Sequence, residues 1–387
     1  MTDFNIKIAG LCVFNVKNDP LMNGFSRLFE SSAANAADAY SQIVSALLER
    51  KKTLGEYLHD MLIFSDSPLL SGMSDDSAKS ALECDLDTVR KIASVRSGDL
   101  KNALFDFYSR DDFIALPDFE SGEFNYSAEY FIEYAKKHGS GAFAEYKAFR
   151  YDGKLEPIED IDPIRLHDLK NYEAQRDQIV ENTRCFLAGK PAQNVLLYGD
   201  RGTGKSATVK AILNEFEELR MIEVSKKDIA LLPGLFKLLK TKPLIFIAAI
   251  DDLAFSEDDD RFGILKAVLE GSLSKRPDNV LIYATTNRRK IVRETEASRE
   301  VSGADAIDES MSLADRFGLF VTFMKPDKRV YLDIVKKLAE DAKIEIPEEK
   351  LFASAETFAL KRGGRSPRTA RQFVDRLTGR IALGLDY

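Results

Sequence analysis

The sequence contains the stretch Gly199-Asp200-Arg201-Gly202-Thr203-Gly204-Lys205-Ser206, which matches the pattern G-x-x-x-x-G-K-[S/T] at every fixed position. The three glycines allow a tight turn that aims consecutive main-chain N–H groups at phosphate oxygens. Lys205 supplies a cation for the β- and γ-phosphates, and the Ser206 hydroxyl is a ligand for Mg²⁺. These eight residues, together with Ala207, predict a binding site for a nucleoside triphosphate.

The segments on either side of this loop fit a strand before it and a helix after it. Asn194–Tyr198 is an apolar run, and the segment that follows the loop has an apolar stripe with helical spacing. Further apolar runs alternate with amphipathic segments, which is the pattern of a parallel sheet buried on both faces. The predicted strands are Val195–Tyr198, Met221–Val224, Leu244–Ile250, Val280–Thr285 and Leu319–Phe323. The predicted fold class is therefore α/β, a P-loop NTPase with a five-stranded parallel sheet flanked by helices.

Polar residues follow two of these strands where each strand ends. Asp251 and Asp252 come directly after Leu244–Ile250, and the carboxyl end of a parallel strand is where a Mg²⁺ ligand belongs in such a fold. We expect Asp251 to hold the water shell of the Mg²⁺ that Ser206 ligates, and Asp252 to polarise the attacking water. Asn287 follows the next strand. Its amide either holds that water or the γ-phosphate, or Asn287 is simply a turn residue.

The chain divides into four segments by composition. Residues 1–150 are predicted to form a mainly helical acidic domain, with a possible strand at Asn5–Val16. Residues 151–170 contain two prolines and an acidic run, which predicts a linker. Residues 171–325 are predicted to form the nucleotide-binding α/β domain. Residues 326–387 carry apolar stripes with helical spacing, which predicts a helical lid.

The charge, apolar stretches and cysteines of the chain limit the kinds of partner and compartment that we expect. The 387 residues carry 55 basic and 63 acidic side chains, a net charge of −8. Residues 1–160 alone hold 17 basic and 27 acidic side chains, so a nucleic-acid partner is not supported. No stretch approaches the roughly 20 apolar residues of a membrane span, and no secretory leader is visible. Three widely separated cysteines argue against a disulfide framework, so we expect a cytoplasmic protein with no membrane partner.

In this order, the phosphate loop, the acidic strand end and the strand that ends at Asn287 resemble the AAA+ ATPase superfamily, over about residues 165–385. The residues of these motifs are most similar to those of a bacterial group of predicted single-module AAA+ ATPases, which is known as a domain of unknown function. Three segments carry that similarity: Asn194–Gly199, Asn279–Arg289 and Ser312–Leu319. The resemblance implies ATP as the nucleotide and Mg²⁺ as its metal.

The resemblance also implies roles for single residues. Lys205, Asp252 and Asn287 match positions that act in hydrolysis. Arg316 matches the arginine finger that reaches the γ-phosphate of a neighbouring subunit, which implies a homo-oligomer. Arg368 matches the second sensor at the start of a lid helix. Independently, a cation in the first turn of a helix opposes the helix dipole and is better explained by a nearby anion; a solvated basic helix is the alternative interpretation.

The implied function is ATP hydrolysis that couples subunit assembly to the remodelling of an unidentified protein partner, bound through the N-terminal domain. Asp252 stands where many AAA+ proteins have glutamate, which predicts slow turnover unless the backbone compensates. Ser225–Ile229 lacks the aromatic–glycine pair of protein-threading machines, so unfolding by threading is not supported. The alternative is an ATP-gated adaptor or loader with little turnover, which Asp252 and the acidic N-terminal domain favour. A GTPase or an ABC-type ATPase fits less well, because neither Asn-Lys-x-Asp nor Leu-Ser-Gly-Gly-Gln occurs. Lys290–Ser310 is expected to be a surface insertion or a loop at a subunit interface.

Overall fold

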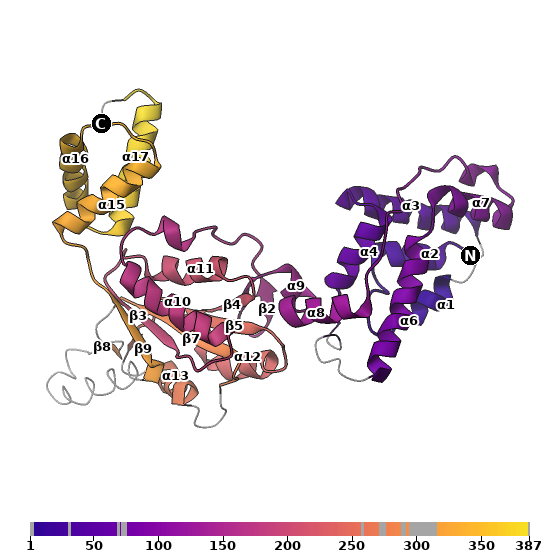
Figure 1. Ribbon diagram of the computed structural model, residues 1–387, viewed down its shortest axis with the longest axis horizontal. Helices are drawn as coiled ribbons and strands as arrows, with labels where there is room; N and C mark the ends of the chain where they lie inside the picture. The colour runs from indigo at the N-terminus through magenta and orange to yellow at the C-terminus, as the bar shows by residue number, and fades with distance from the viewer. Residues whose placement is uncertain are drawn as a thin grey trace. The chain divides into compact units, whose positions relative to one another are not determined.

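The computed structural model describes residues 4–29, 32–67, 70, 76–256, 259–270, 276–287, 292–293 and 316–385. The chain separates into two compact units (Figure 1). The N-terminal unit consists of Met1–Tyr146 with Lys242–Leu244, and the α/β unit consists of Lys147–Thr241 with Ile245–Tyr387. Apart from positions 292 and 293, the predicted insertion or interface loop Lys290–Ser310 lies outside the described residues.

The N-terminal unit is built from helices. They are α1 (Phe4–Ala9), α2 (Pro20–Arg27), α3 (Ala33–Arg50), α4 (Leu54–Ile63), α6 (Asp76–Ala93), α7 (Ser97–Tyr108), the 3-10 helix η1 (Asp111–Phe113), α8 (Ala128–His138) and α9 (Ala142–Glu145). The strand predicted at Asn5–Val16 is wrong, because residues 4–9 form α1. Phe4 and Ile8 are four residues apart, so the helix buries both on one side. Asp85, which is 2% exposed, accepts hydrogen bonds from the main-chain N–H groups of residues 12–14 and so fixes the connection between α1 and α2.

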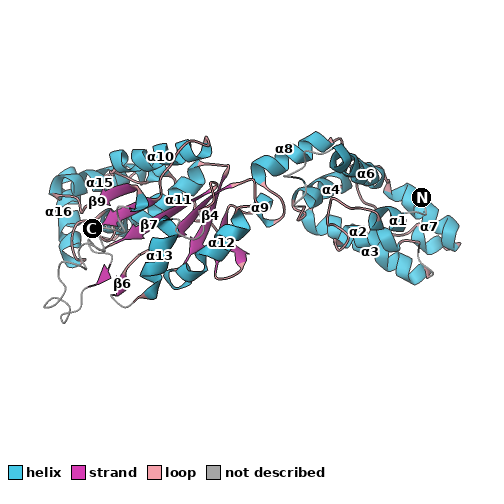
Figure 2. Cartoon of the chain, turned by 90° about the horizontal axis from the view of Figure 1, so that it is seen from below, coloured by secondary structure: helices cyan, strands magenta, loops and turns pink. Residues whose placement is uncertain are grey.

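A seven-stranded sheet in the order β2-β1-β4-β5-β7-β3-β9 forms the centre of the α/β unit (Figure 2). The five predicted strands are present and parallel, as β3 (Val195–Gly199), β4 (Leu219–Val224), β5 (Ile245–Ile250), β7 (Val280–Thr286) and β9 (Leu319–Phe323). The predicted count of five is wrong, because two short strands extend one edge. β1 (Ala148–Tyr151) pairs parallel to β4, and β2 (Leu155–Pro157) pairs antiparallel to β1. The segment predicted as a linker therefore begins inside the sheet. Two of the three β2 residues are exposed, so β2 has no apolar pattern to recognise.

Helices cover both faces of the sheet. Apolar side chains of α10 (Glu173–Leu187) and α11 (Lys205–Glu215) pack into one core with those of the strands. α12 (Leu232–Leu239) and α13 (Asp260–Glu270) lie on the opposite face (Figure 1). β7 is buried along its whole length, as its continuous apolar run predicts. The connections contain the 3-10 helices η2 (Leu166–Asp168) and η3 (Lys226–Leu231) and a two-stranded sheet of β6 (Phe255–Ser256) and β8 (Val292–Arg293).

Three helices at the end of the chain pack around an apolar core of their own and are called here the C-terminal bundle. They are α15 (Lys328–Asp341), α16 (Glu348–Lys361) and α17 (Pro367–Ala382). Ser366 caps α17 by accepting the N–H of Thr369 at 3.1 Å. Within the described ranges, no helix has both the length and the apolar character that a membrane crossing needs.

Candidate nucleotide site

The phosphate loop lies between β3 and α11, and two of its glycines are required by the backbone. Gly199 has a φ of 140°, and a Cβ at this position would lie 1.9 Å from the main-chain oxygen of Phe323 on the neighbouring strand. Gly204, the N-cap of α11, has a φ of 97°. Side chains other than glycine rarely adopt this conformation. The loop therefore leads directly to the first N–H groups of α11, the positive end of the helix dipole.

Lys205 joins the loop to the end of β7. Its side chain is nearly buried, with the residue 5% exposed. Its ammonium donates hydrogen bonds of 2.8 Å each to the main-chain oxygens of Gly199 and Asp200 and to Oδ1 of Asn287. Burial lowers the pKa of Lys205, while nearby aspartates, Asp200 foremost, act in the opposite direction. A cation is thus held among oxygen atoms at the point where loop and sheet meet.

The Asp251 carboxylate is held by two hydroxyl groups. Ser206 Oγ donates to Oδ1 of Asp251 at 2.6 Å, and the hydroxyl of Thr285 donates to the same oxygen. Hydroxyl and carboxylate oxygens are ligands that Mg²⁺ prefers. In the part of the chain that the structure describes, no three His, Cys, Asp or Glu side chains gather as a metal site. A cation at Asp251 would therefore have few protein ligands, which is usual for Mg²⁺ bound together with phosphates.

Asp252 and Asn287 extend the hydrogen bonds of Lys205. Asn287 Nδ2 donates to Oδ1 of Asp252 at 2.7 Å, so the amide bridges the ammonium and the carboxylate. Asp252 has a φ of 52°, in the left-handed region. Its main-chain N–H donates to Oγ1 of Thr285 at 3.0 Å. The residues predicted from the ends of two strands thus meet the phosphate loop in one continuous network.

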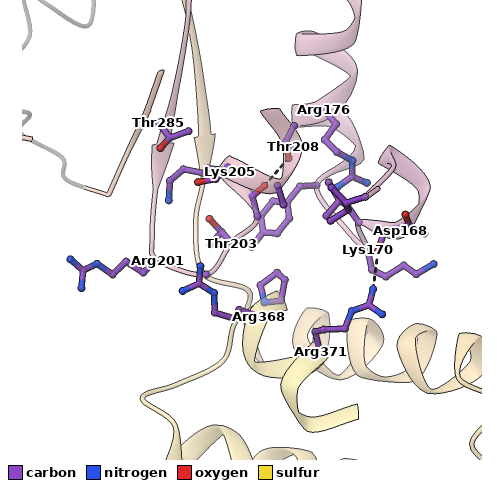
Figure 3. A pocket seen from close by; sticks show the side chains of 18 of the residues that line it. Asp168, Lys170, Arg176, Arg201, Thr203, Lys205, Thr208, Thr285, Arg368 and Arg371 are labelled. Carbon is purple, nitrogen blue, oxygen red and sulfur yellow. Dashed lines mark hydrogen bonds between the residues drawn. The ribbon is translucent and has the colours of Figure 1, made fainter. Parts of the chain in front are cut away.

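A cavity of about 360 Å³ opens beside this network (Figure 3). In Figure 3, Arg368 and Arg371 come from α17, on the other side of the cavity from Lys205 and Thr203. The main-chain N–H of Arg368 donates to the oxygen of Gly202 at 3.1 Å, so the C-terminal bundle touches the phosphate loop directly. The predicted residues that line the cavity are Arg201, Gly202, Thr203, Gly204, Lys205, Ser206, Ala207, Asp251, Asp252, Asn287 and Arg368.

Three predicted residues do not line this cavity. Gly199 and Asp200 take part in the site through the main-chain oxygens that accept the Lys205 ammonium. Arg316 lies elsewhere, and its Nε donates to Oε1 of Glu270, at the end of α13, at 2.5 Å. Within a single chain, Arg316 is therefore not a component of the cavity that holds Lys205.

The sequence reasoning missed Thr285 and Tyr172, which both line the cavity. The sequence predicts Thr285 only as the end of a strand, and its hydroxyl at the end of an apolar run is the signal that marks it. Tyr172 precedes α10 and has a φ of 65°, again in the left-handed region. No local pattern marks this tyrosine, because its place in the wall depends on the fold.

The parallel strands, with the phosphate loop after β3 and polar residues at the ends of β5 and β7, agree with the P-loop NTPase fold that the motifs predict. The AAA+ class that the motifs predict agrees with the family and the relatives to which the chain is similar. Within that class, residues 144–381 match the family described as "Protein of unknown function (DUF815)". The match spans more than half of the chain, and the chain belongs to this family.

Several known proteins are similar to this chain. The proteasome-activating nucleotidase of Methanocaldococcus jannaschii is 25% identical over 261 residues, which cover 58% of this chain and 57% of the relative. The ATP-dependent zinc metalloprotease FtsH of Aquifex aeolicus is 24% identical over 274 residues, or 59% of this chain and 40% of the relative. The chain thus spans less than two thirds of the length of these curated relatives. A solved structure of Thermotoga maritima RuvB matches at 16% identity with a TM-score of 0.41, covering 58% of this chain and 68% of that one.

Proposed function

We propose that the cavity binds MgATP and that the protein hydrolyses it. The observation that carries this proposal is the network Lys205–Asn287–Asp252, which presents an ammonium, an amide and a carboxylate at one wall of the cavity. Arg368 and Arg371 add cations from the opposite wall. A space with cations on two sides and a helix N-terminus at its base fits an anionic triphosphate.

Ser206 and Asp251 are the residues that would hold Mg²⁺, which neutralises charge on the phosphate oxygens when it is bound. Their oxygens lie 2.6 Å apart, so both already point to one place. With the metal bound, the Ser206 oxygen would face it, while the Thr285 hydroxyl would still donate to Asp251 and keep the carboxylate oriented.

Asp252, Asn287 and Arg316 carry the hydrolytic step in this proposal. Asp252 accepts a hydrogen bond from the attacking water, and Asn287 positions that carboxylate relative to Lys205. Arg316 does not line the cavity of its own chain, which supports its delivery to a neighbouring copy. An arginine supplied in this way is worth about 10³- to 10⁵-fold in rate. Full turnover therefore requires a homo-oligomer.

We also propose that hydrolysis remodels a protein partner that binds the N-terminal unit. The names of the curated relatives describe a proteasome-activating nucleotidase and an ATP-dependent protease, which supports a protein as the object of the work. The 27 acidic against 17 basic side chains in residues 1–160 favour a basic partner surface.

Calorimetry with MgATP and turnover measured over a series of protein concentrations test this function. We expect Lys205→Ala to lose MgATP binding, and Arg316→Ala to bind MgATP but turn it over slowly. A mixture of the two variants should recover part of the turnover, because an intact Arg316 then meets an intact cavity in another chain. Wild-type protein that binds no MgATP contradicts the whole proposal. Binding without turnover at any concentration contradicts hydrolysis alone.

An ATP-gated adaptor or loader is the second candidate, and Asp252 favours it. This carboxylate is one methylene shorter than glutamate and is already engaged by Asn287. The adaptor predicts that a partner is captured with ATP bound and that Asp252→Asn leaves its release and capture unchanged. If Asp252→Asn traps the partner permanently, hydrolysis is needed and the adaptor is excluded.

A further inference from the structure

The residues that connect β9 to the C-terminal bundle are held by groups of the nucleotide site. The main-chain oxygen of Phe323 accepts the N–H of Asp200 at 3.0 Å. The oxygen of Met324 accepts the Tyr172 hydroxyl at 2.5 Å, and the N–H of Lys325 donates to Oδ2 of Asp200 at 2.8 Å. Three consecutive residues at the exit from the sheet thus each have one main-chain group tied to the phosphate loop or to the cavity wall. We call Phe323–Lys325 the hinge.

The contact with the hinge explains why an aspartate stands at position 200. Asp200 is the second residue of a loop that binds anions, where a carboxylate opposes a triphosphate by charge repulsion. Its side chain does not line the cavity and instead accepts the Lys325 N–H. The link beyond is short, since Asp327 already caps α15. One side chain therefore ties the phosphate loop to the residues just before the bundle.

Tyr172 holds the hinge through its hydroxyl and lies in a turn with an unusual backbone conformation. Asn171 and Tyr172 both have left-handed φ values, 66° and 65°, a conformation that asparagine tolerates but that is unfavourable for a bulky side chain such as tyrosine. The buried guanidinium of Arg176 donates to the oxygen of Asn171 and holds the turn. The Tyr172 ring packs on that of Phe323, with centroids 5.4 Å apart. Burial, with the charge of Asp200, raises the pKa of Tyr172 to about 12, so the phenol remains a donor at neutral pH.

We propose that Asp200 and Tyr172 are positioning residues that hold the hinge, and with it the C-terminal bundle, where Arg368 faces the cavity. This inference rests on the proposed function, because it names what brings Arg368 to the bound nucleotide. The bundle also meets the loop at its far end, through the hydrogen bond from Arg368 to Gly202. The hinge and α17 are thus two points at which the bundle contacts one loop, and Asp200 belongs to the first of them.

Three variants test the proposal by steady-state kinetics. Asp200→Ala removes the acceptor for Lys325, and Tyr172→Phe removes only the hydroxyl while the ring stays on Phe323. We expect both to lower kcat about tenfold with a change in KM of less than about threefold, because loop binding persists while Arg368 is misplaced. Asp200→Asn is the matched control. It keeps an oxygen acceptor, so it should recover most of the kcat lost in Asp200→Ala.

Hydrogen exchange of the hinge peptide in nucleotide-free protein gives a readout that needs no turnover. The Lys325 amide should exchange about tenfold faster in Asp200→Ala than in wild type, and near the wild-type rate in Asp200→Asn. The inference is overturned if wild type turns over ATP and the variants match it, or if Asp200→Asn is as impaired as Asp200→Ala. If wild type binds no MgATP, the proposed function fails and the placement of Arg368 fails with it. If the Lys325 amide exchanges at the wild-type rate in Asp200→Ala, Asp200 does not hold the hinge, and the proposed function is unaffected.

Discussion

Replacing Thr285 by valine tests how the site is held together. Valine keeps the shape of threonine and removes a hydroxyl that donates to Asp251 and accepts the N–H of Asp252, in a residue that is 4% exposed. Asp251 and Asp252 are exposed, so water can replace part of what is lost. A hydrogen bond contributes about 0.5–1.5 kcal/mol, and we expect the free energy of unfolding of the α/β unit to fall by about 2 kcal/mol for the two. For a unit of this size that lowers its Tm by about 4–8 °C.

The same substitution should act selectively on the metal. A group that orients a metal ligand typically contributes about 10- to 100-fold to metal affinity. We therefore expect Thr285→Val to weaken MgATP binding about tenfold. Binding of ATP in excess EDTA should change less than about twofold, because the contacts of Lys205 and Arg368 do not involve Thr285. Calorimetry with and without Mg²⁺ measures the two affinities on one preparation.

The next residue on β7 supplies the control. Thr286 is 1% exposed, and its hydroxyl donates to the main-chain oxygen of Leu253 at 2.7 Å. Thr286→Val should cost stability by about 1 kcal/mol and leave the ratio of MgATP to ATP affinity unchanged. If Thr285→Val weakens both forms of ATP equally, or if Thr286→Val reproduces the metal-specific loss, Thr285 does not act through Asp251. The assignment of Asp251 as a Mg²⁺ ligand would then be refuted.

Three further predictions concern other parts of the chain. Glu270→Gln removes the carboxylate charge that pairs with Arg316 at 2.5 Å within one chain. Because an exposed ion pair is worth up to about 1 kcal/mol, the protein concentration that gives half-maximal turnover should fall about two- to fivefold in a dilution series. Asp85→Asn should lower the stability of the N-terminal unit by about 2–4 kcal/mol in thermal unfolding and leave MgATP affinity unchanged, because a buried carboxylate that accepts three amides is lost. Burial and then the charge of Lys52 lower the pKa of His59 from its ordinary 6.5. Protonation of His59 therefore favours the unfolded chain, and the Tm of the N-terminal unit should fall as pH drops below 6.5. A His59→Gln variant should reduce this dependence, and an equally steep fall in that variant would assign it to other groups.

Local patterns predict the phosphate loop and five of the seven strands, because the signal for each lies in neighbouring residues. Glycines of fixed spacing shape the loop, and strands covered on both faces must be continuously apolar. The short strands β1 and β2 are not marked by such a run. The contacts that organise the site were also out of reach, since they join distant residues. Asp200 and Lys325 are 125 positions apart, and Tyr172 and Met324 are 152 positions apart.

The geometry of Asp252 bears on whether an aspartate at this position makes the enzyme slow. The expectation of slow turnover compares the reach of aspartate and glutamate from a common backbone, whereas Asp252 is left-handed, with a φ of 52°. That conformation costs about 1–2 kcal/mol outside glycine.

The backbone at Asp252 is held from both sides of the residue. Thr285 Oγ1 accepts the N–H of Asp252, and the main-chain oxygen of Thr285 accepts the N–H of Leu253 at 2.7 Å. Strain of this kind persists where the surrounding structure determines it, often at functional sites. The backbone conformation therefore contributes to the position of this carboxylate alongside its side-chain length, and the hydrogen bond to Asn287 links it to Lys205. Under the proposed mechanism, the rate then depends mainly on the arrival of Arg316 from a second chain, and the shorter side chain does not by itself imply a slow enzyme.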